Sequence, residues 1–204
     1  MSGDASPGQL VILNGAPRSG KSTIATAIQE SFPGTWVNLG VDVARAMTPQ
    51  ALQPGIGLRP GEVGHPAASA VPILYAALCE SVAAHARLGL NVVVDVGLYD
   101  VVVAADAARR LDGIPVLFVG VRCDLETIMQ RRRSAPGYAS AAEGDPVPEA
   151  VLSWQHDVHA HWIYDLEVDT SDRTPERCAA EIKRCLDESP VPDSFARIAL
   201  RASG

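Results

Sequence analysis

The fold is decided by the stretch LVILNGAPRSGKST, residues 10–23. Its first four residues form a short apolar run bounded by turn residues, which predicts a strand buried on both faces of a sheet. The pattern G-x-x-x-x-G-K-[ST] follows at once, and a helical stripe of apolar residues from Ile24 to Ile28 continues until Pro33 ends it. A strand, a glycine-rich loop and a helix in this order predict a phosphate-binding loop.

The residue types in this loop indicate how it would bind a nucleoside triphosphate. The glycines allow successive backbone N–H groups to point at phosphate oxygens, and the following helix adds its positive N-terminus. Lys21 would reach the β- and γ-phosphates, and Ser22 would offer a hydroxyl to Mg²⁺. We therefore expect ATP or GTP, with Mg²⁺ bound through Ser22. The expected nucleotide-binding residues are Gly15, Ala16, Arg18, Ser19, Gly20, Lys21, Ser22 and Thr23.

Strand and helix patterns alternate along the rest of the chain, which predicts an α/β fold. The expected architecture is a three-layer P-loop fold, in which helices cover both faces of a five-stranded parallel sheet. The other strands are expected at 36–39, 91–95, 115–121 and 164–168, and the helices at 21–32, 41–47, 67–88, 101–111, 124–133, 149–161 and 175–186. We expect one kinase domain over residues 1–188, with an irregular loop at Pro49–Pro66. The tail at 189–204 carries two prolines and is expected to be partly disordered.

The overall composition limits which classes of partner and which cellular compartment we expect. The chain has 204 residues and a formal net charge of -7, so its overall field repels nucleic acid and anionic membrane surfaces. No apolar run approaches about 18 residues, and the N-terminus lacks the pattern of an export signal. The four cysteines show no C-x-x-C spacing, which predicts buried thiols in a protein of the reducing cytoplasm. We expect a cytoplasmic protein with no nucleic-acid or membrane partner, and the sequence carries no signal for oligomeric state.

Two aspartates are placed at the ends of predicted strands, where ligands bind in open parallel sheets. Asp42 follows the second strand, and a carboxylate there could orient an acceptor hydroxyl and accept its proton. The alternative is that Asp42 is the N-cap of the short helix that follows. Asp95 ends the strand Val92–Val94, as an Mg²⁺-organising aspartate does, although a simple strand-end role is equally open. We favour a water-mediated or substrate-facing role for Asp95.

Basic and histidine clusters follow later in the chain. Arg131, Arg132 and Arg133 lie on a predicted helix, and one guanidinium could close over the phosphates to stabilise transition-state charge. We assign this role to Arg131, with a solvated basic face as the alternative. The segment His156–His161 lacks the spacing of a zinc-binding helix, so we expect no dedicated transition-metal site there.

Several of these segments together resemble one known family, the chloramphenicol phosphotransferase-like kinases. The resemblance covers about residues 9–186 and is carried by residues 11–15, 19–22, Gly40-Val41-Asp42 with Met47, 93–96, 119–124, Val158-His159 and 164–170. It implies a shikimate-kinase-like fold and phosphorylation of an antibiotic's hydroxyl, with Asp42 as the general base.

The sequence thus favours a phosphotransferase that uses a nucleoside triphosphate to phosphorylate a hydroxyl of a small molecule. The expected acceptor is an antibiotic or related natural product, in a resistance or self-protection role. The catalytic residues would be Asp42, Lys21 and Arg131, and the acceptor would contact Asp42 and Asp95. A metabolic kinase for a sugar acid or nucleoside is the first alternative. The second is a non-catalytic regulatory module, although the chain lacks the N-K-x-D motif expected of a nucleotide switch.

Overall fold

A computed structural model describes residues 6–50, 53, 69–135, 146–188 and 192–201 of the chain. Most of the predicted irregular loop at Pro49–Pro66 lies outside these described residues.

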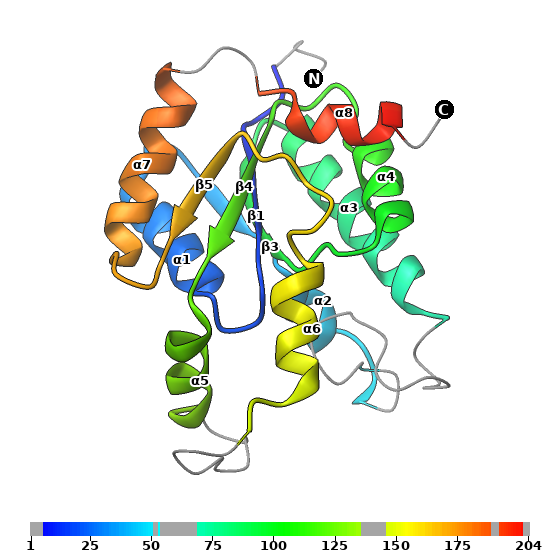
Figure 1. Cartoon of the computed structure of the whole chain (residues 1–204). Coiled ribbons are helices and arrows are strands. Elements are labelled where there is room, and N and C mark those ends of the chain that lie inside the picture. Colours follow the sequence, from blue (N-terminus) through cyan, green and yellow to red (C-terminus); the bar gives the residue numbers. More distant parts are fainter. Residues whose placement is uncertain (1–5, 51–52, 54–68, 136–145, 189–191, 202–204) are drawn as a thin grey trace.

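A parallel five-stranded sheet forms the centre of the molecule, as predicted (Figure 1). Its strands are β1 (Leu10–Asn14), β2 (Trp36–Asn38), β3 (Asn91–Val96), β4 (Val116–Arg122) and β5 (Leu166–Asp169). The strand order is β2-β3-β1-β4-β5, with β1 paired to β3 on one side and β4 on the other. Every residue of β1 is buried, which explains its unbroken apolar character. The glycine-rich loop therefore leaves from the middle of the sheet.

Helices cover both faces of this sheet. They are α1 (Lys21–Ser31), α2 (Val41–Ala46), α3 (Val71–Arg87), α4 (Val101–Arg110), α5 (Leu125–Arg133), α6 (Glu149–Asp157), α7 (Pro175–Glu188) and α8 (Ser194–Arg201). Because side chains alternate along β1, its two faces pack against different helices. Leu10 and Ile12 pack in one core with α3, α4 and α8, whereas Val11 and Leu13 pack in a second core with α1 and α7. Figure 1 shows the two groups on opposite sides of the strands, with α2, α5 and α6 beyond the strand ends.

The connection between α6 and β5 is longer than predicted at both of its ends, for one shared reason. Helix α6 ends at Asp157 instead of His161, and β5 begins at Leu166 instead of Tyr164. The buried Asn14 at the end of β1 donates from Nδ2 to the Val158 carbonyl at 2.9 Å and to the Tyr164 hydroxyl at 3.0 Å. These bonds hold the connection between α6 and β5 in a turn, because a buried amide must find partners.

The C-terminal segment contains a helix that the sequence did not predict, because Ser194–Arg201 of the expected partly disordered tail forms α8. Phe195 on this helix is 2% exposed and packs edge-to-face against Phe118 of β4, with ring centroids 5.1 Å apart. Asp165 accepts a hydrogen bond from the Ser194 N–H at 3.1 Å. The helix is thus stabilised by tertiary burial, which its short and proline-flanked sequence does not reveal.

Three of the four cysteines are buried, as predicted. These are Cys79, Cys123 and Cys178, whereas Cys185 is half-buried, and none of the four forms a disulfide. Asp124 is the N-cap of α5, as predicted, and accepts from the Thr127 N–H at 2.7 Å. Within the described part of the chain, no helix is both long and apolar enough to cross a membrane.

Candidate nucleotide and acceptor site

The phosphate-loop residues connect β1 to α1 in a tight turn that only particular residues allow. A Cβ on Gly15 would lie 2.5 Å from the Val121 carbonyl oxygen, so this position cannot carry a side chain. Gly20 is the N-cap of α1 and has a φ of 91°, in the left-handed region that favours glycine. Arg18 also has a positive φ, of 69°. A non-glycine residue in this region costs free energy, so the loop conformation must be held by its surroundings.

One cavity of about 730 Å³ opens over this loop and contains most of the predicted site residues. Gly15, Arg18, Gly20, Lys21, Ser22 and Thr23 line it, together with Asp42, Asp95 and Arg131. Ala16 and Ser19 belong to the loop but turn their side chains inward, where they are 2% and 0% exposed. Their expected contribution to nucleotide binding would therefore come from their backbone groups.

Lys21 begins α1 and extends back over the loop. Its Nζ donates to the Ala16 carbonyl at 2.8 Å. Burial lowers the pKa of the Lys21 ammonium to about 8, and the carboxylates of Asp95 and Asp42 partly offset this shift. Lys21 therefore still carries its proton in most molecules at neutral pH and presents a positive charge to the cavity.

Ser22 and Asp95 form a direct link between α1 and β3. The Ser22 hydroxyl donates to Asp95 Oδ2 at 2.6 Å, and Asp95 is 5% exposed. Asp95 Oδ1 occupies the space that a side chain on Gly40 would need, so the carboxylate is enclosed between α1 and the loop before α2. Asp95 thus contacts the phosphate-loop residue Ser22 directly, and its expected water-mediated or substrate-facing role stays a prediction.

Asp42 lies in the first turn of α2, whose N-cap is Gly40. The alternative interpretation of Asp42 as a helix N-cap therefore does not describe this structure. Its side chain is 70% exposed and forms a 3.7 Å ion pair with Arg45 one turn later. Among the described residues Arg45 is its one ion partner, and the bond is long, so this exposed carboxylate is available to a ligand in the cavity.

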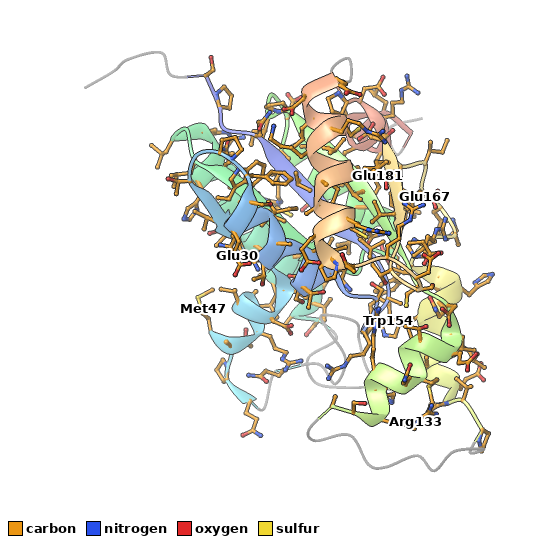
Figure 2. All side chains as sticks on the ribbon, turned by 90° about the vertical axis from the view of Figure 1, so that its left-hand side faces the viewer. Glu30, Met47, Arg133, Trp154, Glu167 and Glu181 are labelled. Carbon is orange, nitrogen blue, oxygen red and sulfur yellow. The ribbon has the colours of Figure 1, made fainter. Side chains whose placement is uncertain are left out.

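The three consecutive arginines of α5 point in different directions. Arg131 alone among them lines the main cavity, whereas Arg132 lines a small apolar void beside Val151 and Trp154. Arg133 is exposed near the outer end of α5, as Figure 2 shows. The Arg131 guanidinium donates to the Thr170 carbonyl at 2.7 Å, to Thr170 Oγ1 at 3.1 Å and to the Arg18 carbonyl at 3.2 Å.

Two aromatic residues outside the predicted site also line this cavity. They are Tyr75 of α3 and Trp154 of α6, both of which contact Gly97, and each is 3% exposed. The Trp154 ring lies so close to Gly97 that a Cβ there would be 2.8 Å from it. Tyr99 packs against Trp154 edge-to-face, with centroids 5.5 Å apart. The sequence does not reveal these contacts, because they join segments that are far apart in the chain. The low number of aromatic residues is the one sequence feature that could have drawn attention to Tyr75 and Trp154.

A buried polar network supports the floor of the site behind these residues. Asn14 accepts from the Leu98 N–H at 2.7 Å and donates to the Tyr164 hydroxyl, which lies 2.7 Å from His159 Nδ1. Burial is the main cause that lowers the pKa of His159 to about 4, so the imidazole is neutral at physiological pH. His159, part of the histidine-rich segment of the sequence, therefore supports the fold through Tyr164.

Known proteins resemble this chain over most of its length. A Mycobacterium tuberculosis protein with the provisional name O-phosphotransferase is 26% identical over 208 residues, which covers 95% of this chain and 89% of the relative. The structure of the Mycobacterium tuberculosis APS kinase in complex with AMPPNP and APS shares 20% identity and has a TM-score of 0.61, covering 89% of this chain and 99% of the kinase. Shikimate kinase from Aquifex aeolicus shares 16% identity with a TM-score of 0.54, covering 88% and 96%.

These two structures show that the fold is that of the P-loop kinases, as the sequence predicted. A family model described as chloramphenicol phosphotransferase-like protein matches residues 8–187. This match and the phosphate loop on the central strand lead to one assignment: the chain belongs to the chloramphenicol phosphotransferase-like family of P-loop phosphotransferases.

Proposed function

We propose that the protein transfers the γ-phosphoryl group of a nucleoside triphosphate to a hydroxyl of a small molecule, and that this acceptor is an antibiotic or related natural product. One observation carries the proposal: the phosphate loop and the exposed carboxylate of Asp42 line the same cavity. A nucleotide-binding module without transfer activity does not need a carboxylate available at that place.

The donor half of the cavity supports a triphosphate with Mg²⁺. A hydroxyl and a carboxylate are hard oxygen donors of the kind Mg²⁺ prefers, and Ser22 and Asp95 already present such a pair 2.6 Å apart. We propose that Ser22 binds the ion directly and that Asp95 holds its water. When bound, Mg²⁺ neutralises charge on the β- and γ-phosphates. Lys21 adds a second positive charge to the same groups.

Asp42 would act on the acceptor at the other side of the γ-phosphate. The acceptor oxygen forms a bond to the γ-phosphorus, while the bond from that phosphorus to the β,γ-bridging oxygen breaks and the nucleoside diphosphate leaves. The hydroxyl proton passes to the Asp42 carboxylate. Because phosphoryl transition states are loose, orientation of the hydroxyl by Asp42 contributes at least as much as proton removal.

The acceptor half of the cavity supports a molecule with an apolar or ring-shaped part. Tyr75 and Trp154 offer aromatic surface there, with the Gly97 backbone between them. Aromatic walls favour planar or apolar groups, which natural-product antibiotics commonly carry. The family description points in the same direction.

A metabolic kinase for a sugar acid remains the second candidate, and Arg45 is the observation in its favour. Its guanidinium lines the cavity beside Asp42, and it could pair with a carboxylate on the acceptor. The two candidates differ in the charge of the acceptor.

A direct assay separates these candidates. The purified protein is incubated with ATP or GTP, Mg²⁺ and panels of uncharged antibiotics, sugar acids and nucleosides, and products are identified by mass spectrometry. We expect a phosphorylated antibiotic or related alcohol, and the Lys21→Ala protein is the control for contaminating kinases. Phosphorylation of sugar acids alone would favour the metabolic role, and nucleotide binding with no transfer to any acceptor would favour the regulatory module.

The expected compartment is part of the same proposal. We propose that the protein acts in the cytoplasm, because none of its four cysteines forms a disulfide and the cytoplasm supplies nucleoside triphosphates.

A further inference from the structure

The carbonyl groups on the outer side of the phosphate loop are held by residues from distant elements. Thr170 Oγ1 donates to the Ser19 carbonyl at 2.7 Å, and Arg131 donates to the Arg18 carbonyl at 3.2 Å. In a planar trans peptide the C=O of one residue points opposite to the N–H of the next. A fixed Ser19 carbonyl therefore fixes the direction of the Gly20 N–H at the start of α1.

Thr170 is a rigid support for this contact. It follows β5 directly and is 4% exposed, and its N–H donates to the Arg122 carbonyl at 3.0 Å, which continues the pairing of β5 with β4. A side chain on Gly20 would lie 3.5 Å from Thr170 Oγ1 and 3.4 Å from Arg131 Nη1. Both residues therefore pack directly against the outer side of Gly20.

Arg131 determines which way the Thr170 hydroxyl points. A guanidinium can only donate, so Thr170 Oγ1 must accept from Arg131 Nη1 at 3.1 Å. The hydroxyl proton is then free to go to the Ser19 carbonyl at 2.7 Å, since the other carbonyl in reach, that of Arg122, is farther at 3.3 Å. A second bond from Arg131 Nη2 to the Thr170 carbonyl fixes the guanidinium itself.

We propose that Thr170, oriented by Arg131, is a positioning residue that holds the Ser19–Gly20 peptide in the conformation that binds phosphate. The two side chains thus set the affinity of the loop for nucleotide before any transfer occurs. This role requires only that the loop binds nucleotide, which is the donor half of the function proposed above. It differs from a lid role, in which Arg131 would act on the transferring γ-phosphoryl group alone.

Nucleotide affinity tests the proposal without any acceptor. In the Thr170→Val protein the shape is kept but the Ser19 carbonyl loses its partner, so we expect the Kd of Mg-ADP and of Mg-ATP each to rise about tenfold. Thr170→Ser restores the hydroxyl, and its Kd values should lie within about twofold of the original. Isothermal titration calorimetry gives the Kd values, and thermal melts show whether each variant is folded.

Thr174→Val is the matched control, because Thr174 is exposed on the same loop and is not among the residues that line the cavity. Its hydroxyl accepts a long 3.4 Å bond from the Arg177 N–H and also interacts with the Glu176 side chain. It should leave nucleotide affinity unchanged. A folded Thr170→Val protein that binds Mg-ADP as tightly as the original overturns the proposal.

Arg131→Lys provides the second test, and it decides the matter if Thr170→Val does not fold. Lysine keeps the positive charge but has one nitrogen in place of the planar fork. It cannot reproduce the Nη2 bond to the Thr170 carbonyl together with the Nη1 bonds to Thr170 Oγ1 and Arg18, so we expect the Kd of Mg-ADP to rise about tenfold. Loss of kcat with unchanged Mg-ADP affinity would instead show the lid role and overturn the proposal. Failure to find an acceptor would affect only the proposed function, because these Kd values would still be measurable.

Discussion

Replacing Gly40 with alanine should disturb the contact between Asp95, at the proposed magnesium site, and α2, which carries Asp42. The new Cβ would coincide with Asp95 Oδ1 and lie 2.7 Å from Asp95 Cγ, whereas the backbone conformation of Gly40, with a φ of -70°, suits alanine. The conflict is therefore one of space. Either Asp95 leaves its 2.6 Å bond with Ser22, or α2 moves away and takes Asp42 with it.

The size of the effect follows from these contacts. A hydrogen bond to a carboxylate contributes about 1.5–3 kcal/mol, and overpacking costs about 1–3 kcal/mol. We expect kcat to fall about 10- to 100-fold, and the Mg²⁺ concentration for half-maximal activity to rise several-fold, roughly three- to tenfold. The melting temperature should fall by roughly 3–10 °C.

A second glycine separates this effect from simple destabilisation. Gly89 has a φ of 91° and nothing lies within 4 Å of a Cβ built there, so Gly89→Ala costs backbone strain of about 1 kcal/mol without touching the site. It should lower the melting temperature and leave the Mg²⁺ dependence unchanged. A Gly40→Ala enzyme with the original kcat and Mg²⁺ dependence would show that the contact between Gly40 and Asp95 does not matter for catalysis.

Three further predictions concern single side chains. Lys21→Ala should slow transfer by at least about 100-fold in a steady-state assay, because it removes a charge beside the transferring group, and unchanged turnover would contradict the phosphate-loop mechanism. Arg131→Ala should lower kcat/KM far more than alanine at Arg132 or Arg133, because only Arg131 of these three lines the main cavity. Three equal, mild effects would indicate a solvated basic face. His159 has its folded pKa lowered to about 4, so its stabilisation is complete above the unfolded value of 6.5 and is lost as the pH falls through this range. Urea unfolding of the original protein and of His159→Gln at about pH 7.5 and 4.5 measures this effect. Between these pH values the free energy of unfolding should fall by about 1–2 kcal/mol more in the original protein than in the variant, a figure that allows for the partial exposure of His159. Equal decreases in the two proteins would contradict this prediction.

The fold was predictable because its signals are local. The buried run of β1, the glycines around Lys21 and the apolar strands each identify an element without reference to the rest of the chain. Helix α8 and the early end of α6 were missed because long-range contacts decide them, namely the burial of Phe195 against Phe118 and the bonds of Asn14. Short segments have weak intrinsic preferences, so tertiary contacts override them.

The site was predictable only in part, for the same reason. The phosphate loop is a contiguous motif, and Asp42 and Asp95 follow from strand order in a parallel sheet. Thr170, Tyr75 and Trp154 come from segments whose proximity depends on how α3, α6 and β5 pack. Their roles could be read only once the cavity and its distances were known.

In the proposed function Asp42 serves the acceptor and not the nucleotide, and the Asp42→Asn protein separates these two roles. Asparagine keeps the shape, and Gly40 caps α2, so folding and Mg-ATP affinity should remain close to the original. The loss should fall on transfer to the acceptor found in the screen, with kcat lower by about 100- to 10,000-fold. If Asp42→Asn transfers phosphate at the original rate, or loses Mg-ATP affinity in proportion to its activity, the proposed role of Asp42 toward the acceptor is contradicted.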